Sequence, residues 1–175
     1  MLFRSGVHLA SMLTTSLLRR LGVTHSRVLI AVPQQAGLRL TFHKDGAFYT
    51  SRLTRPLPSN TDDAARMLLT ELNNTRLYLS TLNFDTLDES LPVLVVDHND
   101  SLAAVVAQVN EGNHGFMCES VGRALAVQKL GISPRFLDFA PEIIYLRELA
   151  EAPPAANLAP ASITSGFRLI RRQRV

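Results

Sequence analysis

Residues 27–53 decide the fold class, and their sequence is RVLIAVPQQAGLRLTFHKDGAFYTSRL. The run 27–32 is apolar and β-branched, residues 38–42 alternate apolar and polar side chains, and residues 47–53 are rich in β-formers. Lys44-Asp45-Gly46 separates the last two segments, and Asp-Gly is typical of tight hairpins because it tolerates a positive φ. The pattern therefore predicts a three-stranded antiparallel meander with the apolar side chains of residues 38–42 facing its core.

Helices and a further strand are predicted on both sides of this meander. Val7–Leu21 repeats leucine at three- and four-residue spacing and ends before Gly22, so we expect a helix. After Pro56 and Pro58, Asn60 or Thr61 should cap a long helix with an apolar stripe that extends from Ala65 to Leu82. Residues 91–96 form a continuous apolar run, which is typical of a strand buried on both faces.

Two more helices are predicted in the second half of the chain. We expect Asp100 to cap a short helix, and Phe116–Leu130 to form another that ends at Gly131. The order of elements is then helix, three strands, helix, strand and two helices, which is an α/β arrangement. A three-stranded antiparallel meander followed by a helix and a buried strand is the start of the ribonuclease H-like fold, the half-domain unit of actin-like ATPases.

The composition restricts the class of protein. The chain has 175 residues, of which 46% are apolar and 19% charged, and this excludes disordered and collagen-like classes. We expect one domain over residues 1–151 and a Pro/Ala linker with a basic tail over 152–175. The single cysteine, Cys118, excludes an internal disulfide and a multi-cysteine zinc site, and indicates a reducing cytoplasm. No apolar run approaches the roughly 18 residues that a membrane span needs.

The charge is unevenly distributed. Residues 1–151 carry 14 basic and 15 acidic groups, whereas the tail has four arginines and no acid. These are Arg168, Arg171, Arg172 and Arg174. A basic footprint confined to a tail suits anionic lipid headgroups as well as nucleic acid. We expect the four arginines to face an anionic membrane surface.

Two groups of residues could carry catalysis. Asp97-His98-Asn99-Asp100 follows the buried strand, where α/β folds place ligands, and could hold a divalent metal in a nuclease. The first strand offers no second carboxylate, so we favour structural roles, with Asp100 as an N-cap and Asp97 as a turn residue. His114, Cys118 and Glu119 could form a nucleophile and its base, but a lone cysteine beside apolar residues is typical of a core.

A nucleotide site is not predicted. An actin-like site needs a phosphate-cradling turn after the first strand, usually with an aspartate for magnesium. The corresponding turn, Val32–Gly37, has no acid, and Pro33 removes a backbone donor. We therefore expect no catalytic residue, no metal and no cofactor.

Two stretches carry a resemblance to a known group of proteins. Gly37–Leu53 resembles the second actin-like half of MSHA-type pilus biogenesis proteins and of PilM-type and GspL-type platform proteins, and Glu71–Tyr78 is similar to the helix that follows there. Ala156–Pro160 and the basic stretch Arg171–Arg174 are similar to the Asn-Leu-Leu-Pro segment and basic stretch of PilN-type proteins. There the segment docks on the actin-like partner, and a transmembrane helix follows.

The resemblance implies Asn157, Leu158 and Pro160 as partner-binding residues, although Ala159 replaces the second leucine of the docking segment. It implies a noncatalytic assembly module of a type IV pilus or type II secretion inner-membrane platform. An actin-like nucleotide-binding or phosphotransfer protein, or a ribonuclease H-like nuclease, is the alternative. The expected partners are inner-membrane platform proteins, an anionic membrane surface and a second copy of the chain, with nucleic acid disfavoured. The expected location is the cytoplasm, at the inner face of the inner membrane.

Overall fold

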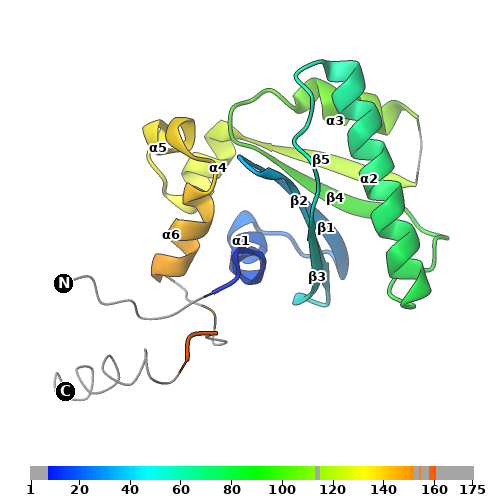
Figure 1. Cartoon of the computed structure of the whole chain (residues 1–175), viewed down its shortest axis with the longest axis horizontal. Coiled ribbons are helices and arrows are strands. Elements are labelled where there is room, and N and C mark those ends of the chain that lie inside the picture. The colour runs from blue at the N-terminus through cyan, green and yellow to red at the C-terminus, as the bar shows by residue number, and fades with distance from the viewer. Residues whose placement is uncertain (1–7, 113–114, 152–153, 155–157, 161–175) are drawn as a thin grey trace.

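A five-stranded mixed sheet with helices on both faces forms the body of the computed structural model, which describes residues 8–112, 115–151, 154 and 158–160 (Figure 1). The strands lie in the order β3-β2-β1-β4-β5. Their bounds are β1 Arg27–Gln34, β2 Gly37–Lys44, β3 Ala47–Leu53, β4 Leu91–Asp97 and β5 Phe116–Gly122. The predicted α/β class is confirmed.

The first three strands form the predicted antiparallel meander. Strand β1 pairs with β2 from Arg27 opposite Lys44 to Gln34 opposite Gly37, so β1 continues two residues beyond the predicted end. The hairpin between β2 and β3 has positive φ angles of 51° at Asp45 and 74° at Gly46, as its Asp-Gly sequence predicts.

Strands β4 and β5 extend the sheet in parallel with β1. Parallel neighbours need crossover connections, and these are the helices α2 (Thr61–Thr81) before β4 and α3 (Ala103–Glu111) before β5. The carboxyl ends of β1, β4 and β5 therefore meet at one edge of the sheet.

Helices α2 and α3 cover one face of the sheet. The Asn60 side chain accepts a hydrogen bond from the Asp63 N–H at 3.0 Å, which confirms the predicted cap of α2. Leu38, Leu40 and Phe42 are fully buried in the core beneath this helix. Leu82, the last residue of the predicted stripe, is instead 41% exposed.

The opposite face carries a 3₁₀ turn and four helices. These are η1 (Ala10–Leu13), α1 (Thr14–Leu21), α4 (Arg123–Leu130), α5 (Pro134–Phe139) and α6 (Ile143–Glu151). As predicted, α1 ends at Gly22, which has a φ of 80°. Leu17, Ile30 and Ile144 are fully buried in the core between these helices and the sheet. Val7 lies outside the described residues.

The predicted helix over Phe116–Leu130 is wrong. Its first half is strand β5, in which Phe116 and Cys118 point into the core and Met117 and Glu119 are exposed, and only its second half is helical. The predicted end at Gly131 is confirmed by a φ of 62° there. The sequence analysis missed α5 and α6, which complete the cover of the second face.

A buried group of charged side chains joins α2 to the sheet. Arg76 donates through Nε to Asp85 at 2.5 Å and through its terminal nitrogens to the Gly115 and Glu89 carbonyl oxygens. Arg27 at the start of β1 donates to the second Asp85 oxygen at 2.7 Å and to the Glu89 carboxylate at 2.5 Å. The segment before β4 is thus held by side chains from α2 and β1.

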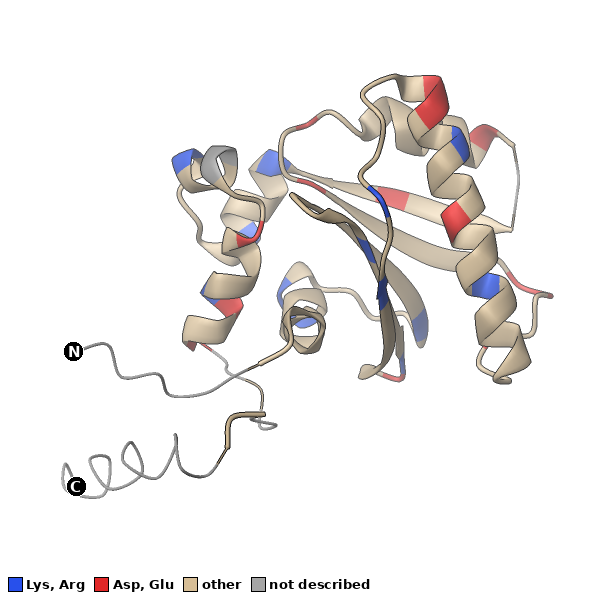
Figure 2. Ribbon diagram, in the orientation of Figure 1, with Lys and Arg blue, Asp and Glu red and all other residues tan. Residues whose placement is uncertain are grey.

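Acidic and basic residues alternate along α2 (Figure 2).

No helix of the described part of the chain combines the length and apolar character needed to cross a membrane.

Candidate functional site

The carboxyl ends of β1 and β4 border a cavity of about 260 Å³. Its walls are the β1–β2 turn, the segment Pro56–Ser59 and the loop His98–Leu102. This is the position at which an α/β sheet commonly binds a ligand, so the predicted metal or nucleotide chemistry should be found here.

The Asp97 side chain accepts hydrogen bonds from the backbone at this edge of the sheet. It is buried, and its two oxygens accept hydrogen bonds from the Ser101 N–H at 2.9 Å and the Leu102 N–H at 2.7 Å. Leu102 is the N-cap residue of α3, so Asp97 holds the entry to that helix. Asp97 is the last residue of β4 rather than the predicted turn residue, and its side chain holds the loop that follows.

The predicted cap of α3 by Asp100 is wrong. Asp100 has a φ of 57°, and its Oδ1 accepts a hydrogen bond at 2.7 Å from the N–H of Arg123, the first residue of α4. The sheet brings the ends of β4 and β5 together, and Asp100 thereby reaches a helix start 23 residues away. The described residues contain no group of three or more His, Cys, Asp or Glu side chains that could hold a metal ion.

The β1–β2 connection is a short hairpin. Gly37 pairs with Gln34 and has a φ of 147°. A Cβ atom at Gly37 would lie 1.8 Å from the Thr54 carbonyl oxygen. Glycine is therefore required here by the close approach of the chain after β3.

Cys118 is a core thiol. It is 8% exposed, and burial raises its pKa to about 11. Its backbone N–H and C=O pair with the side-chain amide of Asn110 on α3 at 2.9 and 2.8 Å, which covers the outer edge of β5 at this residue. Glu119 lies on the opposite face of the strand, and His114 lies outside the described residues. The structure does not unite Cys118 and Glu119 in one site.

His43 is a second buried titratable group, and it lies beneath α1. The Thr14 hydroxyl donates to the Ser11 carbonyl oxygen, so His43 Nε2 donates to that hydroxyl at 2.8 Å. Nδ1 is then an acceptor, and it is buried with no hydrogen-bond partner in the described part of the chain. Burial lowers the pKa of His43 to about 4, so the ring is neutral at pH 7.

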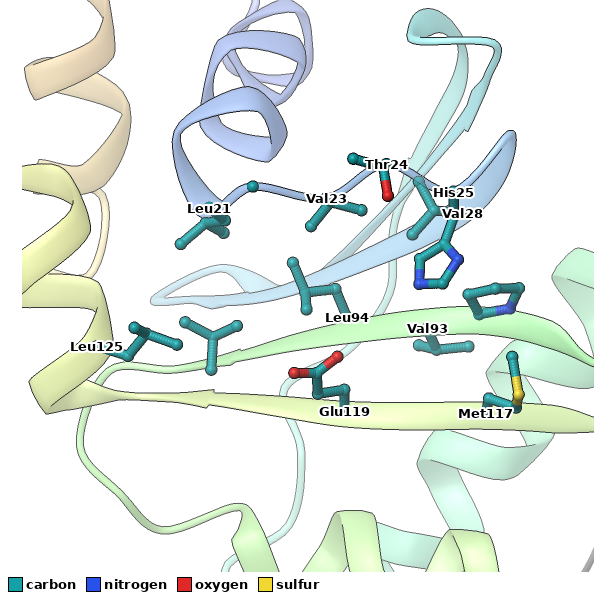
Figure 3. Close-up of a pocket in the computed structure, with 13 residues that line it drawn as sticks. Leu21, Val23, Thr24, His25, Val28, Val93, Leu94, Met117, Glu119 and Leu125 are labelled. Atoms are coloured by element: carbon teal, nitrogen blue, oxygen red, sulfur yellow. The ribbon is translucent and has the colours of Figure 1, made fainter.

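A partly open pocket with apolar and polar lining lies on the α1 side of β4 and β5 (Figure 3). We call it the β4–β5 pocket, with a volume of about 170 Å³. Val28, Val93, Leu94 and Val121 are its buried residues, the segment 21–25 and Leu125 flank it, and Pro92, Met117 and Glu119 complete it. The pocket was not predicted from the sequence, because residues 116–122 were expected to be helical.

Glu119 is the one acidic residue of the β4–β5 pocket, and Thr24 and His25 are its other polar side chains. Met117 is 52% and Leu125 38% exposed, so apolar side chains stand open to solvent around Glu119. The Glu119 carboxylate points into the space below the Leu21–His25 segment (Figure 3). Among the described residues it has no hydrogen-bond or ion-pair partner.

A second hollow, of about 380 Å³, lies between β3 and α2. Leu40 and Phe42 form its base, and Thr50, Thr75 and Tyr78 stand around it. Its one charged residue, Arg52, is already paired with Glu71 of α2. This hollow therefore lacks the unpaired charge that marks the β4–β5 pocket.

Most of the predicted partner- and membrane-binding residues cannot be placed. Leu158 is 54% exposed and Pro160 is also exposed. Asn157 and the four tail arginines, Arg168, Arg171, Arg172 and Arg174, lie outside the described residues.

Comparison with known proteins identifies no relative of the chain. No protein-family model, no curated protein and no solved structure matches the chain.

Proposed function

We propose that this chain is a noncatalytic docking module that binds a partner protein at the β4–β5 pocket. The observation that carries the proposal is the exposure of Met117 and Leu125 beside buried apolar residues and an unpaired carboxylate. Apolar surface of this kind, bordered by a polar group, is typical of interaction sites. Burying an exposed methionine or leucine side chain contributes about 1.5–3 kcal/mol to association.

The fold supports a more specific assignment within the α/β class. A ribonuclease H-like half-domain begins with a three-stranded meander, a helix and a buried strand, and β1–β3, α2 and β4 follow that order. We infer that the domain is ribonuclease H-like and of the actin-like type. The resemblance of Gly37–Leu53 to PilM-type and GspL-type proteins then gives the setting, an inner-membrane platform of a type IV pilus or type II secretion system.

The alternative of a nucleotide-binding, phosphotransfer or nuclease activity has less support. Asp97 and Asp100 follow β4 and accept backbone hydrogen bonds at helix starts. Glu142 accepts a hydrogen bond from the Gln35 N–H in the β1–β2 turn at 2.8 Å. A metal or phosphate site at this edge would compete with these hydrogen bonds. Isothermal titration with Mg-ATP tests the point directly, and saturable binding in the micromolar range would favour the alternative.

The docking function is tested by pairwise interaction with the PilM-type and PilN-type proteins encoded in the same genome. Met117→Asp should abolish the interaction because it places a second carboxylate beside Glu119 among the apolar side chains of the pocket. Leu77→Asp is the matched control, since Leu77 is 59% exposed on α2, outside the pocket. Equal binding by both variants would remove the pocket from the interface, and no binding by the unmodified chain would refute the platform setting.

A further inference from the structure

We propose that the C-terminal segment Gly166–Arg172 docks on the β4–β5 pocket of its own chain, with an arginine of the segment paired to Glu119. This inference rests on the proposed docking role of the pocket and names its first occupant. It makes the basic tail an internal ligand as well as a candidate membrane contact.

The chemistry of the pocket restricts what can cover it. Met117 and Leu125 present exposed apolar surface, which an apolar side chain would cover favourably. Glu119 would lose its water when the pocket is covered, and a buried carboxylate without a partner is strongly unfavourable. A suitable occupant therefore brings apolar side chains and one cation together.

The tail has this composition at the required spacing. Residues 166–172 read Gly-Phe-Arg-Leu-Ile-Arg-Arg. Alternate side chains of an extended segment point to the same side, so in an extended conformation Phe167, Leu169 and Arg171 would share one side. That side offers two apolar groups followed by a guanidinium, which complements the apolar side chains and single carboxylate of the pocket.

The tail also begins close to the pocket. Glu151, the last residue of α6, forms an ion pair with Arg20. Arg20 directly precedes Leu21, which lines the pocket. A fully extended chain spans roughly 3.3–3.6 Å per residue, so the 16 residues from Glu151 to Phe167 can extend about 50 Å and can turn back.

The segment is expected on the face of the sheet rather than at its edge. Asn110 already occupies the backbone N–H and C=O of Cys118, so addition of a strand along β5 is blocked at its centre. Docking on the face would cover Met117 and Glu119. It would also withdraw tail arginines from a lipid surface and occupy the surface offered to a partner protein.

Disulfide trapping in the full chain tests the contact. The test chain carries Met117→Cys and Leu169→Cys, and the control carries Leu77→Cys and Leu169→Cys. The native Cys118 stays in place because burial and a pKa raised to about 11 keep its thiol unreactive. In a glutathione buffer, the intramolecular disulfide should form at least about tenfold faster in the test chain, because docking raises the local concentration of the two thiols.

Charge exchange tests the pairing itself. Glu119→Arg in the test chain should slow trapping about fivefold or more, and a further Arg171→Glu should restore it. Glu111→Arg is the control, because Glu111 is an exposed acid at the end of α3, outside the pocket. Equal trapping in test and control chains, disulfides only between chains, or no effect of Glu119→Arg would overturn the proposal. If partner binding is still lost with Met117→Asp in that case, the proposed function stands and only its internal ligand is refuted.

Discussion

Changing Asp85→Asn should destabilise the fold far more than Glu89→Gln, although both carboxylates accept a hydrogen bond from Arg27. The Asp85 side chain is fully buried and also accepts from Arg76, whose side chain is 8% exposed. The Glu89 side chain is 76% exposed. Each variant thus neutralises one carboxylate that pairs with Arg27. The Asp85 carboxylate is buried and the Glu89 carboxylate is exposed.

The magnitude follows from what remains after each change. Asp85→Asn leaves the Arg76 guanidinium buried without a counter-charge, and breaking a buried pair typically costs about 3–5 kcal/mol. The asparagine oxygen can still accept one hydrogen bond, so we expect a value near the lower end, about 3 kcal/mol. Glu89→Gln weakens a surface pair and should cost about 1 kcal/mol or less. For a chain of this size these values correspond to falls in Tm of about 6–12 °C and at most about 4 °C.

Urea denaturation followed by far-ultraviolet circular dichroism measures both free energies of unfolding. The m-values of the two variants should match that of the unmodified chain, so that the difference reports on the folded state. Equal destabilisation by the two variants, within about 0.5 kcal/mol, would refute the role of Asp85 as the buried counter-charge of Arg76.

Three further outcomes are expected. Gly37→Ala should destabilise the chain severely because its Cβ would meet the Thr54 carbonyl oxygen at 1.8 Å, whereas Gly46→Ala, with open space around it, should cost only about 1 kcal/mol; thermal denaturation compares them. The pKa of His43 is about 4 when folded and 6.5 when unfolded, so the stability that depends on the neutral ring is present above pH 6.5 and lost as the pH falls toward 4. Urea titrations should show about 2 kcal/mol less stability at pH 5 than at pH 7 from this residue, and His43→Gln should flatten that dependence. Cys118 should react with a thiol reagent at pH 8 at least about a hundredfold more slowly in the folded than in the unfolded chain, and fast labelling would show that its thiol is accessible.

The meander was predictable because two independent local signals agree there. The alternation of residues 38–42 and the Asp45-Gly46 turn each indicate a hairpin, and neither depends on distant parts of the chain. Strand β5 was not predictable in the same way. Residues 116–130 contain one internal glycine, Gly122, and the conformation of the first half depends on pairing with β4, which no local pattern encodes.

The same dependence on tertiary structure explains the error at Asp100. Capping rules assign an aspartate to the helix that follows it directly, and by that rule Asp100 should serve α3. The parallel pairing of β4 with β5 places the start of α4 beside the loop after β4, so Asp100 serves α4 while Asp97 serves α3. The helix starts at this sheet edge need hydrogen-bond acceptors for their free N–H groups, and the two aspartates supply them.

This use of the aspartates bears on where a function can reside in the described part of the chain. The Asp97 carboxylate accepts one backbone hydrogen bond on each oxygen, so half of its lone pairs are used by the loop that leads into α3. The Glu119 carboxylate accepts no hydrogen bond from the described residues. It lies among exposed apolar side chains on the other face of the neighbouring strand. An unpaired carboxylate beside exposed apolar side chains is suited to holding a peptide with an apolar and a cationic side chain.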